Sequence, residues 1–188
     1  MIMEMKSIEF FKTPEGSVMY KAAGEPLKEL KESDREMVSG LLSLIRTRYP
    51  DAFKALGEIY SRYERNRWTY EFWMVSRFIR CNMGCYDTSK FDIDADGFMH
   101  FEQAQCPLLG CECKWEGVIC KPRLDTKLTD REEEILGLIA SGLQACEIGE
   151  KLCISKSTVD RHRENIKAKL GVRTIADLSK FYFEQLKK

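Results

Sequence analysis

Residues 128–172 read LTDREEEILGLIASGLQACEIGEKLCISKSTVDRHRENIKAKLGV, and this stretch decides the fold of the C-terminal third of the chain. Residues that favour helix ends divide it at regular intervals. The expected helix starts are Thr129, Ser155 and Thr174, and the expected ends are Gly142 and Gly171. An acid follows Thr129 and Thr174 three residues on, which is the capping-box pattern. Together with a short helix over Ala145–Leu152, these signals predict four helices.

The two middle helices are separated by only three residues, Cys153, Ile154 and Ser155. A turn of this length between two short helices is the spacing of a helix-turn-helix. The apolar residues that two steeply crossing helices would share are Ile148, Leu152, Ile154 and Val159. Gly149 has no side chain, so we expect the second helix to approach the first closely at this point.

Net charge is zero over the whole chain, but its distribution is uneven. From Lys121 to Lys188 there are 14 Lys and Arg against 11 Asp and Glu, and the first 120 residues carry 16 against 19. The helix expected after Ser155 holds the basic residues Lys156, Arg161, Arg163, Lys167 and Lys169. A basic helix of this length fits the major groove of DNA, with its N-terminal half nearest the base edges.

The motifs LTDREEEIL, EIGEKL, IS-KSTVDRH and NIKAKLGV together resemble the LuxR-type (GerE-type) helix-turn-helix domain of bacterial transcription regulators. The resemblance covers about residues 128–182. It implies four helices, the third of which reads double-stranded DNA and the fourth of which can pair with a second protomer. It also implies a cytoplasmic protein that acts on promoters as a homodimer, with RNA polymerase as a possible further partner.

By position in this motif, the resemblance implies that Asp160, Arg161 and Glu164 face the bases. The residues it implies as phosphate contacts are Lys156, Thr158, Arg163 and Lys167. The chain departs from the family pattern at Gly149, where Ala is frequent, and in having two acids among the base-facing positions. Acids accept hydrogen bonds from cytosine N4 but repel phosphate.

The first 120 residues follow a different pattern. Two apolar runs around Pro14–Gly16 predict a hairpin over residues 8–20, and Ser33 with Glu36 predicts a capped helix that Pro50 ends. Two further aromatic-rich helices are expected from residues 51 and 69, the second of them ending near Gly84. The expected fold is therefore mainly α with small β-hairpins: a helical and Cys-rich N-terminal module followed by a four-helix domain.

We expect a hairpin and three helices in residues 1–80, a Cys-rich β-hairpin module in 81–120, a linker in 121–127 and the helix-turn-helix domain in 128–188. The run Asp92-x-Asp94-x-Asp96-Gly97 resembles a calcium loop, but Gln103 stands where a bidentate Glu is needed. The alternating apolar residues around it predict a hairpin instead.

The composition limits the class of protein. At 44% hydrophobic and 32% charged residues, the chain reads as a globular protein, and no apolar run is long enough to predict a membrane span. The N-terminus lacks a secretory pattern, so we expect a cytoplasmic protein without a membrane partner. No nucleophile–base set, useful carboxylate pair or phosphate loop is present, so we expect no enzyme.

Six of the eight cysteines fall between Cys81 and Cys120. In a reducing cytoplasm, clustered cysteines indicate metal more often than disulfides. The predicted metal ligands are Cys81, Cys106, Cys113 and Cys120, because Cys81 continues a buried helical stripe and the other three recur every seven residues. Zinc is the expected metal, an iron–sulfur cluster uses the same ligands, and unligated thiols are the remaining alternative. Cys146 and Cys153 are expected to be packing residues.

The segment CPLLGCECKWEGVIC also resembles Cys-rich modules of uncharacterised bacterial and phage proteins that carry this helix-turn-helix. Two functions remain open. The first is a sequence-specific transcription regulator with a zinc-binding module, or with an iron–sulfur cluster that senses redox state. The second is an adaptor whose helix-turn-helix serves protein assembly.

Overall fold

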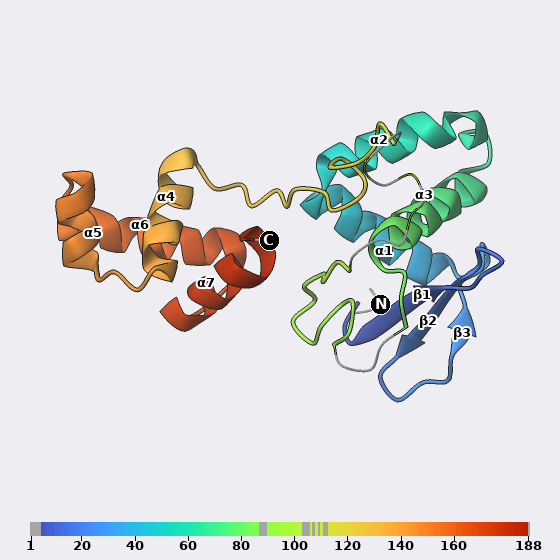
Figure 1. Cartoon of the computed structure of the whole chain (residues 1–188), viewed down its shortest axis with the longest axis horizontal. Coiled ribbons are helices and arrows are strands. Elements are labelled where there is room, and N and C mark those ends of the chain that lie inside the picture. Colours follow the sequence, from blue (N-terminus) through green and yellow to red (C-terminus); the bar gives the residue numbers. More distant parts are fainter. Residues whose placement is uncertain are drawn as a thin grey trace. The chain divides into compact units, whose positions relative to one another are not determined.

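The computed structural model describes residues 5–86, 90–102, 106, 108, 110 and 113–187. The chain divides into two compact units, Met1–Arg123 and Leu124–Lys188 (Figure 1). We call them the first and the second unit. None of the helices in the described ranges combines the length and the apolar character needed to cross a membrane.

The first unit packs three helices against a small antiparallel sheet (Figure 1). Its elements are β1 (Ile8–Lys12), β2 (Val18–Ala22), β3 (Lys28–Glu29), α1 (Arg35–Arg48), α2 (Pro50–Tyr60), the 3₁₀ turn η1 (Ser61–Tyr63) and α3 (Arg67–Asn82). The strand order is β1-β2-β3, and α3 packs against α1, α2, β1 and β2. The expected hairpin is confirmed, and β3 adds a strand that was not expected.

Two local predictions in the first unit need correction. Helix α1 does not begin with a Ser33–Glu36 capping box: its N-cap is Asp34, whose side chain makes no cap bond. The Asp34 carboxylate instead accepts a hydrogen bond from the Lys31 amide at 2.9 Å, which fixes the chain where it enters the helix. The aromatic-rich helix expected from residue 51 begins at Pro50, and its buried residues are Ala52, Ala55 and Leu56, while its aromatic residues Phe53 and Tyr60 are only half-buried.

The segment around Ile93 completes the sheet edge. Ile93 exchanges two backbone hydrogen bonds with Ile8 of β1 and forms an antiparallel bridge with Met99. Gly97 adopts a positive φ of 81° in the turn between these residues, a conformation that glycine adopts without steric cost. The hairpin expected here is therefore present as a tight turn with one bridge.

The second unit contains α4 (Asp130–Ala140), α5 (Ala145–Leu152), α6 (Lys156–Leu170), α7 (Ile175–Phe181) and the π-helical end η2 (Tyr182–Leu186). All four predicted helices are present. Their starts are confirmed at Thr129, Ser155 and Thr174, each of which caps a helix with its side chain. Gly142 and Gly171 have positive φ at the predicted ends. The shared core is Ile135, Leu136, Ile139, Ala145, Ile148, Val159, Ile166 and Leu178.

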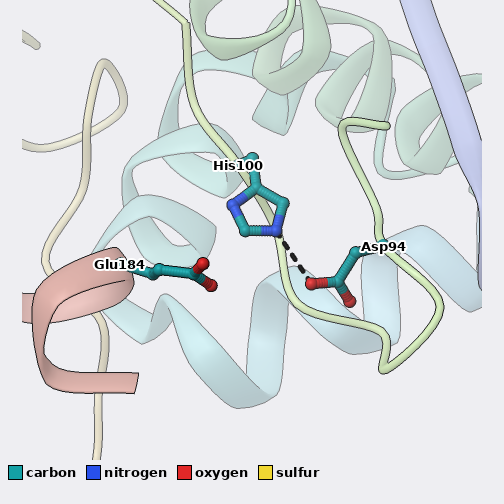
Figure 2. A group of neighbouring side chains, drawn as sticks. All are labelled: Asp94, His100 and Glu184. Atoms are coloured by element: carbon teal, nitrogen blue, oxygen red, sulfur yellow. Dashed lines mark hydrogen bonds and ion pairs between the residues drawn. The ribbon is translucent and has the colours of Figure 1, made fainter. Parts of the chain in front are cut away.

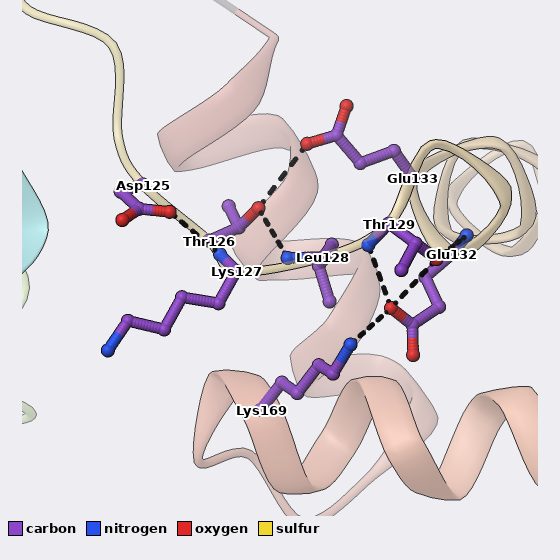
Figure 3. Close-up of polar contacts among 8 residues, drawn as sticks. All are labelled: Asp125, Thr126, Lys127, Leu128, Thr129, Glu132, Glu133 and Lys169. Atoms are coloured by element: carbon purple, nitrogen blue, oxygen red, sulfur yellow. Dashed lines mark hydrogen bonds and ion pairs between the residues drawn. The ribbon is translucent and has the colours of Figure 1, made fainter.

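Glu132 fastens the start of α4 to α6 (Figure 3). Its carboxylate accepts hydrogen bonds from the Thr129 amide at 2.8 Å and from Lys169 Nζ at 2.5 Å. Only 3% of Glu132 is exposed. The hydrogen bonds from Lys169 and the Thr129 backbone lower the pKa of Glu132 against the opposing effect of burial.

We expect Glu132→Ala to destabilise the second unit by about 2 kcal/mol, because a cap and a charge-assisted hydrogen bond are lost together. The stabilisation by Glu132 is present above its unfolded pKa of about 4.3 and is lost as the pH falls through its lowered folded value. Chemical unfolding followed by far-UV circular dichroism at pH 7 and pH 3 measures both effects. Glu134→Ala, at an exposed acid of the same helix, is the control. Equal stability of the two variants at pH 7 would contradict the prediction.

Candidate nucleic-acid interface and thiol cluster

One side of helix α6 packs against the rest of the second unit, and the other side is exposed to solvent. Val159 and Ile166 are fully buried in the core of the second unit. The Ser155 hydroxyl accepts a hydrogen bond from the Thr158 amide at 3.1 Å and thereby caps the N-terminus of α6. Gly149 of α5 lies against the turn that precedes α6, where an added Cβ would stand 2.7 Å from the Ile154 carbonyl oxygen. The expected close approach at Gly149 is confirmed.

The open face of α6 carries the residues predicted to meet bases. Asp160, Arg161 and Glu164 are all exposed. The same face also exposes Ser157 and Asn165, which the sequence reasoning did not single out. Their positions, four residues before and after Arg161, are the signal that could have found them, since residues at this spacing share a helix face. Asparagine can donate to and accept from adenine in the major groove.

The residues predicted to contact phosphate differ in solvent exposure and in ion pairing. Lys156 is exposed, whereas Thr158, Arg163 and Lys167 are half-buried. Arg163 lies 3.6 Å from the Asp160 carboxylate, and Lys167 lies 2.7 Å from that of Glu164. Each pair brings one cation and one acid of α6 together, so the acids partly neutralise the helix.

Lys156 and Arg161 therefore carry the uncompensated charge of this face. Within the part of the chain that the structure describes, neither has a carboxylate within ion-pair distance. The Thr158 hydroxyl is engaged with Ser155 Oγ at 2.8 Å, and Lys169 is directed to Glu132. A basic N-terminal half on an exposed helix can attract a phosphate backbone and place Arg161 against base edges.

The second feature is a cluster of thiols in the first unit. Cys81, in the last turn of α3, and Cys120 are both buried, and their thiols interact. The fully buried Asn82 holds the two segments together. Its amide nitrogen donates to the Phe78 and Ile119 carbonyls at 3.0 and 2.8 Å, and its oxygen accepts from the Lys121 amide at 2.7 Å. The predicted burial of Cys81 is confirmed.

The hydrogen bond and nearby arginines polarise this thiol pair. The hydrogen bond from Cys120 lowers the pKa of Cys81 to about 6 despite burial, and the positive charges of Arg77 and Arg80 contribute. The same hydrogen bond raises the pKa of Cys120, as do burial and the negative charges of Cys81, Cys113 and Cys106. The two thiols therefore titrate as a coupled pair, in which one thiol ionises more readily than the other.

Cys113 and Cys106 are half-buried and near enough to affect Cys120 electrostatically. The Cys113 carbonyl accepts a hydrogen bond from the Glu116 amide at 3.0 Å, and Gly117 turns the chain back toward Cys120. Among the described residues, no three of the thiol sulfurs lie within 4.8 Å of one another. The four predicted ligands therefore stay a prediction, within which Cys81 and Cys120 are the buried pair.

The remaining cysteines lie apart from this group or outside the described residues. Cys85 follows α3, and its amide donates to the Glu102 carboxylate at 2.7 Å. Cys111 lies outside the described residues. The prediction that Cys146 and Cys153 are packing residues is wrong, because both are exposed. The buried face of α5 is formed by Ala145, Ile148 and Gly149, and Cys153 follows the helix in a left-handed conformation with φ of 53°.

The calcium-like run uses Asp92 and Asp94 within the fold, and Figure 2 shows one of them, Asp94, beside His100. Asp92 accepts a hydrogen bond from the Phe10 amide at 2.7 Å. Asp94 accepts from the Phe98 amide and lies 2.9 Å from His100 Nε2. Burial opposes ionisation of Asp94, but the hydrogen bonds from His100 and Phe98 lower its pKa. These contacts explain the acids as structural elements of a turn.

Comparison with known proteins identifies one part of the chain. The family model described as "Bacterial regulatory proteins, luxR family" matches residues 126–181. The chain is 48% identical over 54 residues to the transcriptional regulatory protein MctR of Rhizobium johnstonii, covering 29% of this chain and 25% of MctR. It is 45% identical over 53 residues to the fimbriae Z protein of Escherichia coli K12, covering 28% of this chain and 25% of that protein.

A longer match, of 36% identity over 89 residues, is to the uncharacterized response regulatory protein YgeK of Escherichia coli K12, covering 47% of this chain and 56% of YgeK. The chain spans about a quarter of the length of the first relatives and about half of YgeK. No solved structure matches the chain. The family match and the capped four-helix geometry agree over the same residues: the C-terminal part of this chain is a LuxR-family helix-turn-helix DNA-binding domain.

Proposed function

We propose that the chain is a transcription regulator that binds double-stranded DNA sequence-specifically, with α6 in the major groove. The observation that carries this proposal is the exposed face of α6, on which Arg161 and Asn165 stand beside Asp160 and Glu164. Arginine favours guanine and asparagine favours adenine, while acids accept from cytosine. The match to MctR, a transcriptional regulatory protein, and the family match over residues 126–181 support DNA as the partner.

Two apolar side chains support a homodimer on DNA. Ile175 at the start of α7 and Phe183 in η2 are each 49% exposed. Large apolar side chains at the last helix would be buried if that helix paired with its equivalent in a second protomer. Two α6 helices related by such a contact would read two half-sites. The first unit would then supply the signal, and contact with RNA polymerase would complete regulation.

We expect Arg161→Ala to lower affinity for the preferred site about 10- to 100-fold, because a bidentate base contact is worth about 1–3 kcal/mol. Lys156→Ala should weaken preferred and random DNA alike and reduce the slope of log affinity against log salt by about 1. Selection of bound genomic fragments followed by gel-shift titrations at several salt concentrations measures both. Lys54→Ala, an exposed lysine of α2 in the other unit, is the matched charge control.

The adaptor alternative predicts a different result. If α6 serves protein assembly alone, Arg161→Ala and Lys156→Ala should leave fragment binding at the level of Lys54→Ala. Failure of the unmodified chain to retain any fragment above a scrambled sequence at low salt would overturn DNA binding altogether.

A further inference from the structure

We propose that Cys81, Cys106, Cys113 and Cys120 bind one zinc ion through four thiolates in the first unit. None of these residues lies in the LuxR-family domain, and the family match does not include them. The site therefore goes beyond DNA binding and does not depend on it. Its role would be to hold the segment that leads from α3 to the second unit.

Half of the proposed site is held in place by the protein. Cys81 and Cys120 are both buried, and zinc–sulfur bonds of about 2.3 Å in a tetrahedron would place their sulfurs about 3.8 Å apart. Asn82 fixes the distance between the two backbones, because it bonds to the residues on both sides of Cys120. Such support by a neighbouring residue is typical of built metal sites.

The other two ligands come from a segment with little apolar core of its own. Between residues 113 and 122 the buried side chains are Ile119, Cys120 and Pro122. The turn from Cys113 to Cys120 is closed by backbone hydrogen bonds, including Gly117 N to the Cys120 carbonyl at 3.1 Å. A complete site requires the sulfurs of Cys106 and Cys113 to join the Cys81–Cys120 pair, because no three thiol sulfurs of the described residues lie within 4.8 Å of one another. Metal binding commonly supplies the folding energy that such a segment lacks.

The charges around the thiols also suit a zinc site. Four thiolates and one Zn²⁺ leave a net charge of about −2. Arg77 stands one turn before Cys81 in α3, and Arg80 directly precedes it in the chain, and the positive charges of both act on Cys81. Lys114 and Lys121 each lie next to a proposed ligand in the chain.

The test measures metal in the full-length chain purified from zinc-supplemented cells. We expect about one zinc per chain and no colour. Cys81→Ser and Cys120→Ser should each lower zinc occupancy at least tenfold at a fixed chelator concentration. Cys85→Ser and Cys146→Ser should retain it, because these thiols lie outside the proposed set. Serine is nearly isosteric with cysteine but is a poor zinc ligand, so the variants change the chemistry more than the packing.

A second measurement does not depend on variants that fold. Unmodified chain loaded with Co²⁺ in place of zinc should show the intense thiolate-to-cobalt absorption of a tetrahedral four-sulfur site. Bound iron with acid-labile sulfide, a Cys81–Cys120 disulfide without metal, or metal-free protein lacking the cobalt bands would each overturn the zinc site. Gel shifts on the same samples separate this result from DNA binding, since the second unit contains none of the four thiols.

Discussion

Replacing Asn82 by alanine is expected to lower the free energy of unfolding of the first unit by about 3–5 kcal/mol. Asn82 is fully buried, and two of its three side-chain hydrogen bonds join α3 to the segment 119–121, while the third stays within α3. Removing one partner leaves the others buried and unsatisfied, which costs about 1–3 kcal/mol for each such group. Lys121 also has a positive φ of 50°, a conformation that a non-glycine residue keeps only where its surroundings enforce it.

The tryptophans make this prediction measurable in the intact chain. All three, Trp68, Trp73 and Trp115, belong to the first unit. Urea unfolding followed by tryptophan fluorescence therefore reports that unit alone. Asn165→Ala, at an exposed asparagine of α6, is the matched control and should leave the fluorescence transition unchanged. A loss of unfolding free energy below about 1 kcal/mol for Asn82→Ala would show that the hydrogen bonds of Asn82 to the residues beside Cys120 are not needed for stability.

The second unit could be predicted from sequence because its signals are local. Thr129, Ser155 and Thr174 cap helices through hydrogen bonds to residues three positions away, and each such pair is visible in a short window of sequence. The glycines at the helix ends terminate the helices because each adopts a positive φ. Local rules of this kind need no knowledge of what packs against the helix.

The first unit was predicted less well because tertiary contacts decided it. Ser33 and Asp34 are both good N-cap residues, and the contact between Asp34 and Lys31 selects the helix start. Strand β3 consists of two exposed residues, Lys28 and Glu29, and it forms by antiparallel pairing with the edge of β2. Neither contact has a signature within its own segment.

The candidate sites also combine features that local sequence predicts with features that depend on tertiary contacts. Asp160, Arg161 and Glu164 were expected from the family resemblance, and all three are exposed on α6. Helical spacing from Arg161 would have added Asn165. The predicted thiol ligands were chosen from a buried stripe and an even spacing, and in the structure Cys81 and Cys120 are both buried on segments that Asn82 joins. The importance of Asn82 could not be inferred, because its partners are backbone groups 37 and 39 residues away.

The other large effect is expected at Gly149, where α5 meets the turn into α6. The Ile154 amide donates to the Gly149 carbonyl at 2.9 Å, and the Ile154 carbonyl returns toward the Gly149 Cα. An added Cβ would stand 2.7 Å from that oxygen, which is backbone and cannot rotate away. The chain between them is already constrained, because Cys153 holds a left-handed conformation with φ of 53°. Any side chain at this position must therefore displace the turn that sets the angle of α6.

We expect Gly149→Val to destabilise the second unit by about 3 kcal/mol and to weaken DNA binding, because overpacking against the turn outweighs a gain in helix propensity of about 0.5 kcal/mol. The stability of the second unit is measured by urea unfolding followed by circular dichroism. Because all three tryptophans lie in the first unit, the transition of the second unit is the one that tryptophan fluorescence does not report. Gly137→Ala in α4 is the control, since its Cβ would meet only the Tyr182 side chain, at 3.5 Å. Gly137→Ala should stabilise the unit by about 0.5–1 kcal/mol. The unfolding free energy of Gly149→Ala should lie between those of Gly149→Val and Gly137→Ala. If Gly149→Val unfolds at the same urea concentration as Gly137→Ala, the close packing of α5 on the turn does not determine the stability of this domain.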